Sequence, residues 1–356
     1  MIPISKPDIS ELEKAAVMQV MDSGMIVMGP MTAEFEEAFA DLCGVKHAIA
    51  VSSGTTALHL AMLAHNIGPG DEVITTAFSF AATVNAILFV GARPVFADID
   101  EQTFNITPGE VEALITPRTK AILPVHLYGH LCDMDELLDI SSRYGIPIIE
   151  DACQAVSASY NNKQAGSFGT AAFSFYATKN LMCGEGGMIT TNDDEIAENC
   201  RLLRSHGMRR RYYHETLGFN FRMTDMEAAI GLTQLKRLPE FNAKRSFNAA
   251  YLNAKIESVE TPRVKEGHTH AWHQYTVRIN HGRNRDDAVR QLSEAGIGTG
   301  IFYPVPLHQQ PYIRKTVGNI TLPTTEKLAS EVFSLPIHTQ LTKDDLETIV
   351  QEVNKL

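Results

Sequence analysis

The sequence predicts an α/β protein with a mostly parallel central sheet flanked by helices, followed by a smaller C-terminal α+β domain. Between residues 47 and 203, short apolar runs alternate with helical segments, and continuous β-branched runs of this kind are typical of parallel strands buried on both faces. The pattern changes near residue 240. The length of 356 residues also suits two domains of about 150 residues each.

Two helices are expected before the first strand. Ser10 and Glu13 form a capping box ahead of an apolar stretch, and Gly24 ends that helix. A second helix is expected over about 32–43, before Gly44, because glycine readily takes the left-handed conformation that closes a helix.

The alternating region predicts seven short strands, with helices between the first five and after the last. Strands are expected at HAIAV (47–51), EVITT (72–76), RPVFADI (93–99), KAILPV (120–125), GIPIIE (145–150), AAFSFY (171–176) and GMITT (187–191). Helices are expected at about 54–65, 80–90, 108–115, 133–144 and 193–203. The uncharged stretch 73–92 has the length of a membrane span, but its hydroxyl and amide side chains fit a buried strand and helix better.

The chain beyond about residue 240 is expected to form the smaller domain. It contains a helical pattern over about 240–254, a strand-like WHQYTVRI (272–279), a helical pattern near 285–295 and a proline-rich YPVPLHQQP (303–311). We therefore place a large domain at 1–240 and a small domain at 241–356.

Charge and cysteine usage narrow the class of function. The chain has 31 Lys and Arg against 42 Asp and Glu, so 31 − 42 gives a formal charge of −11. Phosphate backbones and anionic membranes need a basic surface, so neither is expected as a partner. The cysteines include no CxxC pair, which supports neither a disulfide framework nor a thiolate zinc site. No signal peptide is indicated at the N-terminus, and a cytoplasmic protein is expected.

Side chains that could bind a ligand follow several of the predicted strands, at the edge where parallel α/β sheets bind ligands. After HAIAV, the segment SSGTTAL opens a helix. There Ser53, Gly54 and Thr55 could hold a phosphate on free backbone N–H groups. An ordinary capped helix start explains these residues about as well.

Three further positions indicate a cofactor site only when they are considered together. Phe78 could stack on a flat cofactor ring, although core packing is the commoner role. Asp151 could pair with a protonated ring nitrogen, with Gln154 alongside, although a structural salt bridge competes with that interpretation. Lys179 lies in a loop after an apolar strand, with Ser174 at the base of that loop. It could form a Schiff base with a carbonyl cofactor, whereas most loop lysines are solvated. In this order on successive strands, the motifs supply what pyridoxal phosphate requires.

The motifs resemble those of the DegT-type sugar aminotransferases, which are pyridoxal-phosphate (PLP) enzymes of fold type I. The resemblance covers nearly the whole chain and includes SSGTTAL, GPGDEVITT, IEDACQA, SFYATKN, GEGGMITT, LGFNFRMTDMEAAIG and YPVPLH. It implies a fold type I PLP-dependent transferase that moves an amino group to a keto-deoxy nucleotide sugar. Glutamate is the expected donor, and the GEGG after the lysine favours C4 over C3 of the sugar.

The resemblance also implies roles for individual residues. Lys179 takes the position of the Schiff-base lysine, and Asp151 that of the acid paired with the pyridine nitrogen. Gln154 and Phe78 take the positions that pack against the cofactor ring. Three further residues fall at positions that contact the cofactor phosphate, namely Gly54, Thr55 and Ser174.

A homodimer with shared active sites is implied as well. In the family, an asparagine of the GFNFRM motif reaches the phosphate of the neighbouring subunit, and here that position is Asn220. Tyr303 and His308 align with the substrate-side segment. One departure is Cys153, where alanine is usual, and we expect a harmless packing change.

Other interpretations stay open at this point. Relatives that carry histidine at the lysine position are dehydratases, so Lys179 favours transamination, but a sugar dehydratase, a cyclitol transaminase and a non-catalytic regulatory protein of this fold remain alternatives. Five arginines over 201–211 could attract a pyrophosphate or form a solvated surface. The spacing of His268, His270 and His273 suits no familiar zinc motif, and no metal is expected.

Overall fold

The computed structural model describes residues 1–279 and 282–356. Its central sheet is built from β1 (His47–Val51), β2 (Glu72–Thr76), β3 (Arg93–Ala97), β4 (Thr119–Ile122), β5 (Ile149–Asp151), β8 (Thr170–Ser174) and β9 (Gly187–Thr191). The strands lie in the order β3–β2–β4 and β5–β8–β9–β1, and parallel bridges between β4 and β5 at Ile122–Ile148 and beyond them at Val125–Asp151 join the two sets.

The expected mostly parallel sheet is confirmed, with β9 as the reversed strand. Pairing is parallel between β2 and its neighbours and between β5 and β8, whereas β9 is antiparallel to both β8 and β1. The connection 175–186 between β8 and β9 holds no helix. Because a parallel return needs a long crossover, usually a helix, this loop brings the chain back antiparallel.

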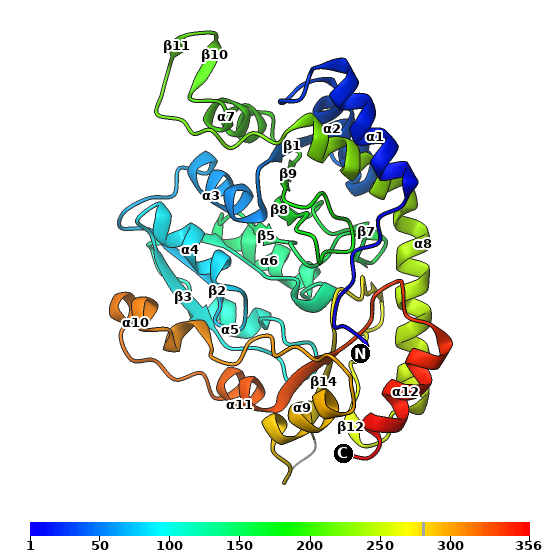
Figure 1. Ribbon diagram of the computed structural model, residues 1–356. Coiled ribbons are helices and arrows are strands. Elements are labelled where there is room, and N and C mark those ends of the chain that lie inside the picture. Colours follow the sequence, from blue (N-terminus) through cyan, green and yellow to red (C-terminus); the bar gives the residue numbers. More distant parts are fainter. Residues whose placement is uncertain (280–281) are drawn as a thin grey trace.

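Helices cover both faces of the sheet (Figure 1). In chain order they are α1 (Glu11–Ser23), α2 (Pro30–Cys43), α3 (Gly54–Ala64), α4 (Ala81–Phe89), α5 (Pro108–Ala113), α6 (Met134–Tyr144) and α7 (Asp194–Arg204). Alternate residues of β1 belong to different buried clusters. Ile49 packs with residues of α3, α4 and α7, and Ala50 with residues of α2 and α6. The strand is therefore apolar throughout because both of its faces are covered.

Helix α2 begins two residues earlier than the sequence pattern predicts, because a distant side chain caps it. The Asp225 carboxylate accepts hydrogen bonds from the backbone N–H groups of Gly29, Met31 and Thr32 at 2.8–3.1 Å. A Cβ at Gly29 would lie 2.8 Å from the Asp225 carboxylate, so glycine suits this contact. The cap joins the start of α2 to the start of α8 (Asp225–Lys255).

Helix α8 is twice as long as expected and runs along one side of the molecule toward the C-terminal helix (Figure 1). Its first half was not predicted, because Pro239 lacks a backbone N–H and is unfavourable inside a helix. Thr224 and Glu227 form a capping box at its start. The boundary that we place at residue 240 falls inside this continuous helix, and the division of the chain into two domains stays a prediction.

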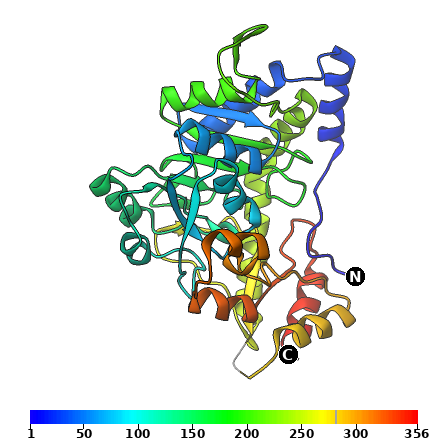
Figure 2. The ribbon, with the colours of Figure 1, turned by 90° about the vertical axis from the view of Figure 1, so that its left-hand side faces the viewer.

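The C-terminal part of the chain forms a separate small sheet. Strand β14 (Tyr275–Ile279) pairs antiparallel with β12 (Val259–Glu260) and β15 (Val332–Leu335). This sheet packs on the end of α8, on α9 (Arg285–Glu294) and on α12 (Lys343–Val353). Figure 2 shows this part below the central sheet. The remaining elements are β6 (Ser159–Tyr160), β7 (Lys163–Gln164), β10 (Met208–Arg210), β11 (Tyr213–His214), β13 (His268–Thr269), the short η1 (Leu127–Gly129) and η2 (Leu307–Gln309), α10 (Pro311–Val317) and α11 (Pro323–Glu331).

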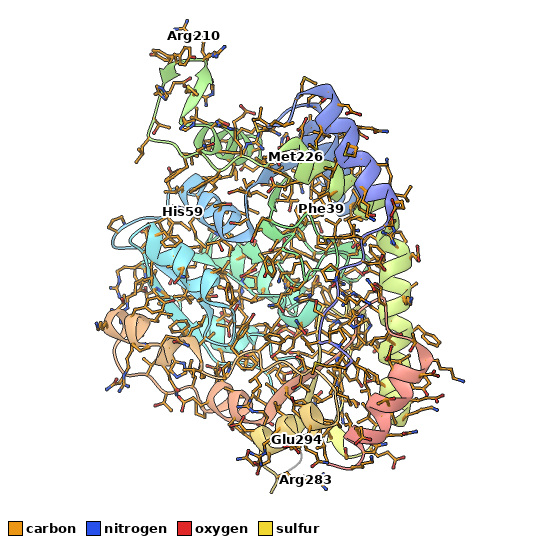
Figure 3. The ribbon with its side chains drawn as sticks, in the orientation of Figure 1. Phe39, His59, Arg210, Met226, Arg283 and Glu294 are labelled. Atoms are coloured by element: carbon orange, nitrogen blue, oxygen red, sulfur yellow. The ribbon has the colours of Figure 1, made fainter. Side chains whose placement is uncertain are left out.

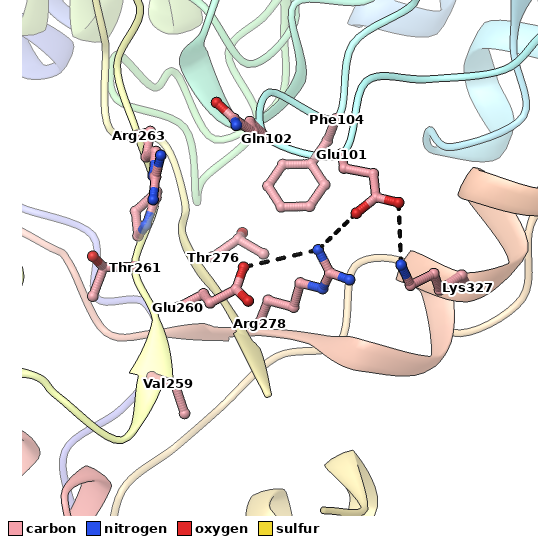
Figure 4. A pocket seen from close by; sticks show the side chains of 11 residues that line it. Glu101, Gln102, Phe104, Val259, Glu260, Thr261, Arg263, Thr276, Arg278 and Lys327 are labelled. Carbon is pink, nitrogen blue, oxygen red and sulfur yellow. Dashed lines mark hydrogen bonds and ion pairs between the residues drawn. The ribbon is translucent and has the colours of Figure 1, made fainter. Parts of the chain in front are cut away.

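Part of the contact between the small sheet and the central sheet is polar. Arg278 of β14 forms ion pairs with Glu331 at 2.5 Å, Glu101 at 3.1 Å and Glu260 at 3.8 Å. Lys327 of α11 also binds Glu101, at 3.1 Å. Figure 4 shows the pairs that Glu101 and Glu260 form, at the wall of a cavity of about 520 Å³. Glu101 follows β3, so the network ties the small sheet to the large one.

The hairpin of β10 and β11 projects from the body of the molecule, with Arg210 at its tip (Figures 1 and 3). The guanidinium groups of Arg210 and Arg211 lie over the rings of Tyr213 and Tyr212, 5.1 and 5.0 Å from the ring centroids.

None of the helices that the structure describes combines the length and the hydropathy needed to cross a membrane.

Glu150, on β5, organises the interior beside the site. Its fully buried carboxylate accepts hydrogen bonds from the backbone N–H groups of Gly166, Phe168 and Gly169 at 2.9–3.1 Å. It also lies 3.0 Å from Nε2 of the buried His126. A buried carboxylate is tolerated only when it is paired in this way, so Glu150 holds the 166–169 turn against the sheet.

Glu150→Ala should therefore destabilise the protein, because it leaves several buried donors without an acceptor. We expect the free energy of unfolding to fall by about 3–5 kcal/mol, measured as a lower urea midpoint. Glu34→Ala, at an exposed position of α2, is the matched control and should change it by less than about 0.5 kcal/mol. Equal midpoints for the two variants would contradict this role for Glu150.

Candidate active site

A cavity of about 510 Å³ lies at the carboxyl ends of β1, β2, β5 and β8. This is the edge at which the sequence places its candidate residues. Eight of those residues line the cavity, namely Ser53, Gly54, Thr55, Asp151, Gln154, Ser174, Lys179 and Tyr303. The structure therefore brings together residues that are up to 250 positions apart (303 − 53).

One corner of the cavity is the start of α3. Ser53 caps the helix by accepting a hydrogen bond from the backbone N–H of Thr56 at 3.1 Å. The first N–H groups of a helix have no partner within it, so those of Gly54 and Thr55 are available to an anion. A Cβ at Gly54 would lie 2.7 Å from Cβ of Ser174 and 2.8 Å from Sγ of Cys153. Only glycine leaves this corner open.

Two glycines after Lys179, Gly186 and Gly187, lie beside the same corner of the cavity. A Cβ at Gly187 would lie 2.3 Å from the carbonyl oxygen of Ser53, and Gly186 forms a parallel bridge with Ser53. The absence of side chains thus lets the start of β9 approach the helix cap closely. The group that lies against these glycines is therefore the backbone at Ser53.

Asp151 is held firmly at the end of β5. Its Oδ2 accepts a hydrogen bond from the hydroxyl of Thr83 at 2.7 Å, and Oδ1 accepts one from the backbone N–H of Cys153 at 3.2 Å. Ser79 lies 2.8 Å from the Thr83 hydroxyl. Asp151 is 5% exposed as a residue and lines the cavity. The hydrogen bonds from Thr83 and Cys153 orient its carboxylate before any ligand binds.

Lys179 reaches the cavity from the loop after β8. Burial lowers the pKa of its amine, and the nearby Cys153 and Asp151 oppose that shift. Its Nζ lies 3.5 Å from Nε2 of His273. A lysine of this kind is a better nucleophile and base near neutral pH than a solvated lysine.

Tyr303 and Gln154 close another side of the cavity. The Gln154 side chain donates from Nε2 to the Tyr303 hydroxyl at 3.3 Å, and its Oε1 accepts from the backbone N–H of Tyr128 at 2.8 Å. Burial raises the pKa of the Tyr303 hydroxyl, with nearby Asp151 adding to the shift. Tyr303 therefore acts here as a neutral hydrogen-bonding group.

The structure does not place Phe78 in the cavity. Phe78 is fully buried and its ring lies 6.2 and 6.5 Å from those of Phe104 and Tyr128. Phe80, the residue that precedes α4, is 59% exposed and lines the cavity instead, with its ring 6.1 Å from that of Tyr303. Both aromatic residues follow the same strand, β2. The sequence pattern alone could not tell which of them lines the cavity and which is buried in the core.

His308 also lies away from the cavity. Its Nε2 is 3.0 Å from the Glu326 carboxylate, and the ring is buried against Phe96. The backbone N–H of the preceding Leu307 donates to the carbonyl of Ala77 at 2.8 Å, which anchors this segment and turns His308 inward. Asn220 is exposed and does not line the cavity of its own chain.

Several cavity residues were not assigned to this site from the sequence. The N-terminal segment contributes Ile4 and Ser5, and the segment before β14 contributes His273 and Gln274. Further lining residues are Thr83, Tyr176, Thr178, Glu185 and Phe302. Most of them come from loops or from the N-terminal segment, and Thr83 comes from α4. Their positions at the cavity depend on tertiary contacts that no local pattern records.

The three histidines near residue 270 have separate environments. The ring of His268 stacks on His130 at 4.4 Å, and His270 stacks on Trp272 at 4.1 Å, whereas His273 faces Lys179. Within residues 1–279 and 282–356, no group of three or more His, Cys, Asp or Glu side chains is placed to hold a metal ion.

The arginines of 201–211 do not line the cavity. Arg204 is buried, pairs with Glu36 at 2.5 Å and donates to the carbonyl of Ala50 at 2.6 Å. It is therefore a structural residue. Arg201 pairs with Glu198, and Arg209 pairs with Glu215.

Comparisons with known proteins match nearly the whole chain to one family. Residues 7–354 match the DegT/DnrJ/EryC1/StrS aminotransferase family. The chain is 42% identical, over an alignment of 366 residues, to the GDP-perosamine synthase of Caulobacter vibrioides, covering 100% of this chain and 98% of the relative.

Two solved structures are similar in fold. DesV of S. venezuelae, in complex with a ketimine intermediate, superposes with a TM-score of 0.93 at 40% identity, covering 96% of this chain and 93% of that chain. The PLP-form of Spr1654 from Streptococcus pneumoniae superposes with a TM-score of 0.94 at 28% identity, covering 99% of this chain and 98% of that chain.

Proposed function

The chain belongs to the DegT/DnrJ/EryC1/StrS aminotransferase family, and we propose that it transfers an amino group from glutamate to C4 of a keto-deoxy nucleotide sugar. The enzyme is a PLP-dependent aminotransferase. The observation that carries the proposal is that the half-buried Lys179 lines one cavity with Asp151 and with the open helix start at Gly54.

The residues of this cavity fit PLP. The N–H groups at the start of α3 and the hydroxyl of Ser174 would hold its phosphate, in the corner that a Cβ at Gly54 would fill. Asp151 would bind its ring nitrogen, and Gln154 would pack against its ring. We assign the stacking role to Phe80 in place of Phe78, because Phe80 lines the cavity.

The chain's own residues would hold and move the protons of the reaction. When bound, PLP supplies an aldehyde that exchanges amino groups and a ring that accepts electrons. Because burial lowers the pKa of Lys179, a larger share of its amine is unprotonated and can attack a carbonyl carbon, then accept a proton and return it. The Asp151 carboxylate, fixed by Thr83 and Cys153, would keep the ring nitrogen protonated.

The substrate assignment rests on the family and on the shape of the site. The relative from Caulobacter vibrioides is a GDP-perosamine synthase, and the GEGG after Lys179 resembles that of members that act at C4. Tyr303 would donate to a sugar oxygen near the reacting carbon, because its hydroxyl is protonated and lines the cavity. His308, which lies away from the cavity, is not assigned to the substrate.

We also propose a homodimer with shared sites. Asn220 is exposed and lies outside the cavity of its own chain, as a residue that serves a neighbouring subunit would. Near it, Phe219 and Phe221 stack at 4.8 Å in partly buried positions. The hairpin of β10 and β11, which precedes them in the chain, projects from the body of the molecule (Figure 1). A second copy on this face would bring Asn220 to the phosphate corner.

Lys179→Ala should abolish covalent attachment of the cofactor. After incubation with PLP and reduction with borohydride, mass spectrometry should find the added mass on the Lys179 peptide of the unmodified sequence only. Transamination should fall by at least about 100-fold, as for loss of a general acid–base group. Lys163→Ala, at an exposed lysine, should retain attachment. Added mass that persists in Lys179→Ala would refute this role.

A substrate panel tests the rest of the assignment. We expect conversion of a nucleotide-linked 4-keto-6-deoxy sugar with glutamate, giving an amine at C4 by mass spectrometry and NMR. Conversion of a cyclitol ketone alone, or an amine at C3, would refute it. A protein that binds PLP yet converts none of the substrates would favour the regulatory alternative.

Mixed dimers test the shared site. Asn220→Ala should weaken PLP binding roughly 10- to 100-fold, because a hydrogen bond to a charged group is lost. Mixing it with Lys179→Ala chains should restore tight binding in part of the sites, since one chain then supplies Lys179 and the other Asn220. A monomer in sedimentation, or no restoration on mixing, would exclude the shared site.

A further inference from the structure

His273 faces Lys179 from the other part of the chain. Its Nε2 lies 3.5 Å from Nζ of Lys179, and its side chain is buried at the wall of the cavity. Lys179 follows β8 of the central sheet, whereas His273 precedes β14 of the small sheet. The contact therefore exists only because the two parts of the chain meet at this cavity.

The backbone around His273 is fixed from several sides. Arg245 of α8 donates from Nη1 to the carbonyl of Trp272 at 2.9 Å and to that of His273 at 3.5 Å. The side-chain amide of Asn180, next to Lys179 in sequence, donates to the carbonyl of Ala271 at 2.5 Å. These bonds link the Lys179 loop, α8 and the His273 segment into one unit.

Arg245 is itself unusual, because it is buried and binds backbone carbonyls. Arg245 is 7% exposed, and burial lowers the pKa of its guanidinium group to about 10. No ion pair to a carboxylate occurs for it in the part of the chain that the structure describes. A buried charge is costly without compensation, so its position is explained by the carbonyls that it holds.

We propose that His273 is a positioning residue for Lys179, with a neutral imidazole whose Nε2 accepts a hydrogen from Nζ. The proposal rests on the proposed function of Lys179 as the residue that accepts and returns a proton. One hydrogen of the amine then points at His273, which directs the nitrogen lone pair toward the cavity. When Nζ gains a proton, His273 stabilises the ammonium group, and the proton later leaves from Nζ. His273 itself gains no proton.

The surroundings of His273 agree with a neutral ring. Burial lowers the pKa of His273 well below its usual value, and the charge of Lys179 adds to this effect. The groups that face the pair are Asp151 and Cys153 on the side of Lys179, and Arg245 and His270 on the side of His273. A cationic imidazole would repel the Lys179 ammonium group, so only the neutral ring can support it.

The second ring nitrogen supports the assignment. An acceptor at Nε2 requires the hydrogen to be on Nδ1. Nδ1 of His273 is buried and has no hydrogen-bond partner among the residues that the structure describes. A buried polar atom without a hydrogen-bond partner is rare enough to need a reason. Here the ring orientation places Nε2 next to Lys179, and Nδ1 is left without a partner in that orientation.

The test compares two variants of His273. His273→Leu removes the acceptor, whereas His273→Gln keeps an acceptor at about the reach of Nε2. The first readout uses the cofactor-free protein and measures by mass spectrometry how fast a small acylating reagent labels Lys179 at each pH. The second readout is the turnover of the loaded enzyme at saturating substrate. His268→Leu is the matched control, since His268 stacks on His130 outside the cavity.

We expect the labelling midpoint of Lys179 to move to lower pH in His273→Leu, because an acceptor that favours the charged amine is lost. Turnover should fall roughly 10- to 100-fold, the effect of one hydrogen bond to a charged group. His273→Gln should return most of both properties, and His268→Leu should alter neither. A change that merely loosened the fold would lower turnover without this directed shift of the midpoint.

Equal midpoints for the unmodified sequence and His273→Leu would overturn the proposal, and so would a Gln variant that behaves like the Leu variant. If His273→Leu does not fold, His273→Asn takes its place, because its shorter amide ends near Nδ1 and cannot reach Lys179. The proposed function has a different test: it would be refuted if PLP attached covalently to Lys179→Ala. The comparison of labelling midpoints uses cofactor-free protein, so its outcome does not depend on that result.

Discussion

The cost of burying a lysine amine governs the arrangement of this site. Lys179 is a half-buried residue at the wall of the cavity, and burial disfavours the charged form of its amine. A solvated amine would be almost wholly protonated near neutral pH, and would be a poorer nucleophile and base there. The protein meets this cost with a neutral acceptor, His273, on one side and a fixed carboxylate, Asp151, on the other. Both partners depend on contacts between distant segments.

Two neighbouring acidic residues on β5 have different roles, one structural and one at the cavity. Side chains alternate along a strand, so Glu150 points into the protein and Asp151 toward the cavity. Glu150 uses its acceptor capacity on backbone N–H groups and on His126. Asp151 receives hydrogen bonds from Thr83 and Cys153 yet still lines the cavity. One strand thus supports the turn behind the site and supplies the group in front of it.

Helix α8 connects the parts of the molecule on which the site depends. At its start, Asp225 caps α2. Further along, Arg245 holds the carbonyls before β14, and Asn248 donates to the carbonyl of His338 at 3.2 Å. The ion pairs of Arg278 with Glu101 and Glu331 fix the small sheet at the other end of the contact. These contacts set where His273 lies relative to Lys179.

The sequence by itself determined the order of strands and helices and the residues at the strand ends. Burial on both faces leaves a strong apolar pattern, and capping boxes such as Ser10 with Glu13 are local. The same locality identified Gly54, Asp151 and Lys179, because each follows its own strand. Tertiary structure decided the rest. The choice of Phe80 over Phe78, the inward turn of His308, the early start of α2 and the approach of His273 all depend on contacts between segments far apart in the chain. No local pattern records such contacts, since they arise only when separately formed elements pack together.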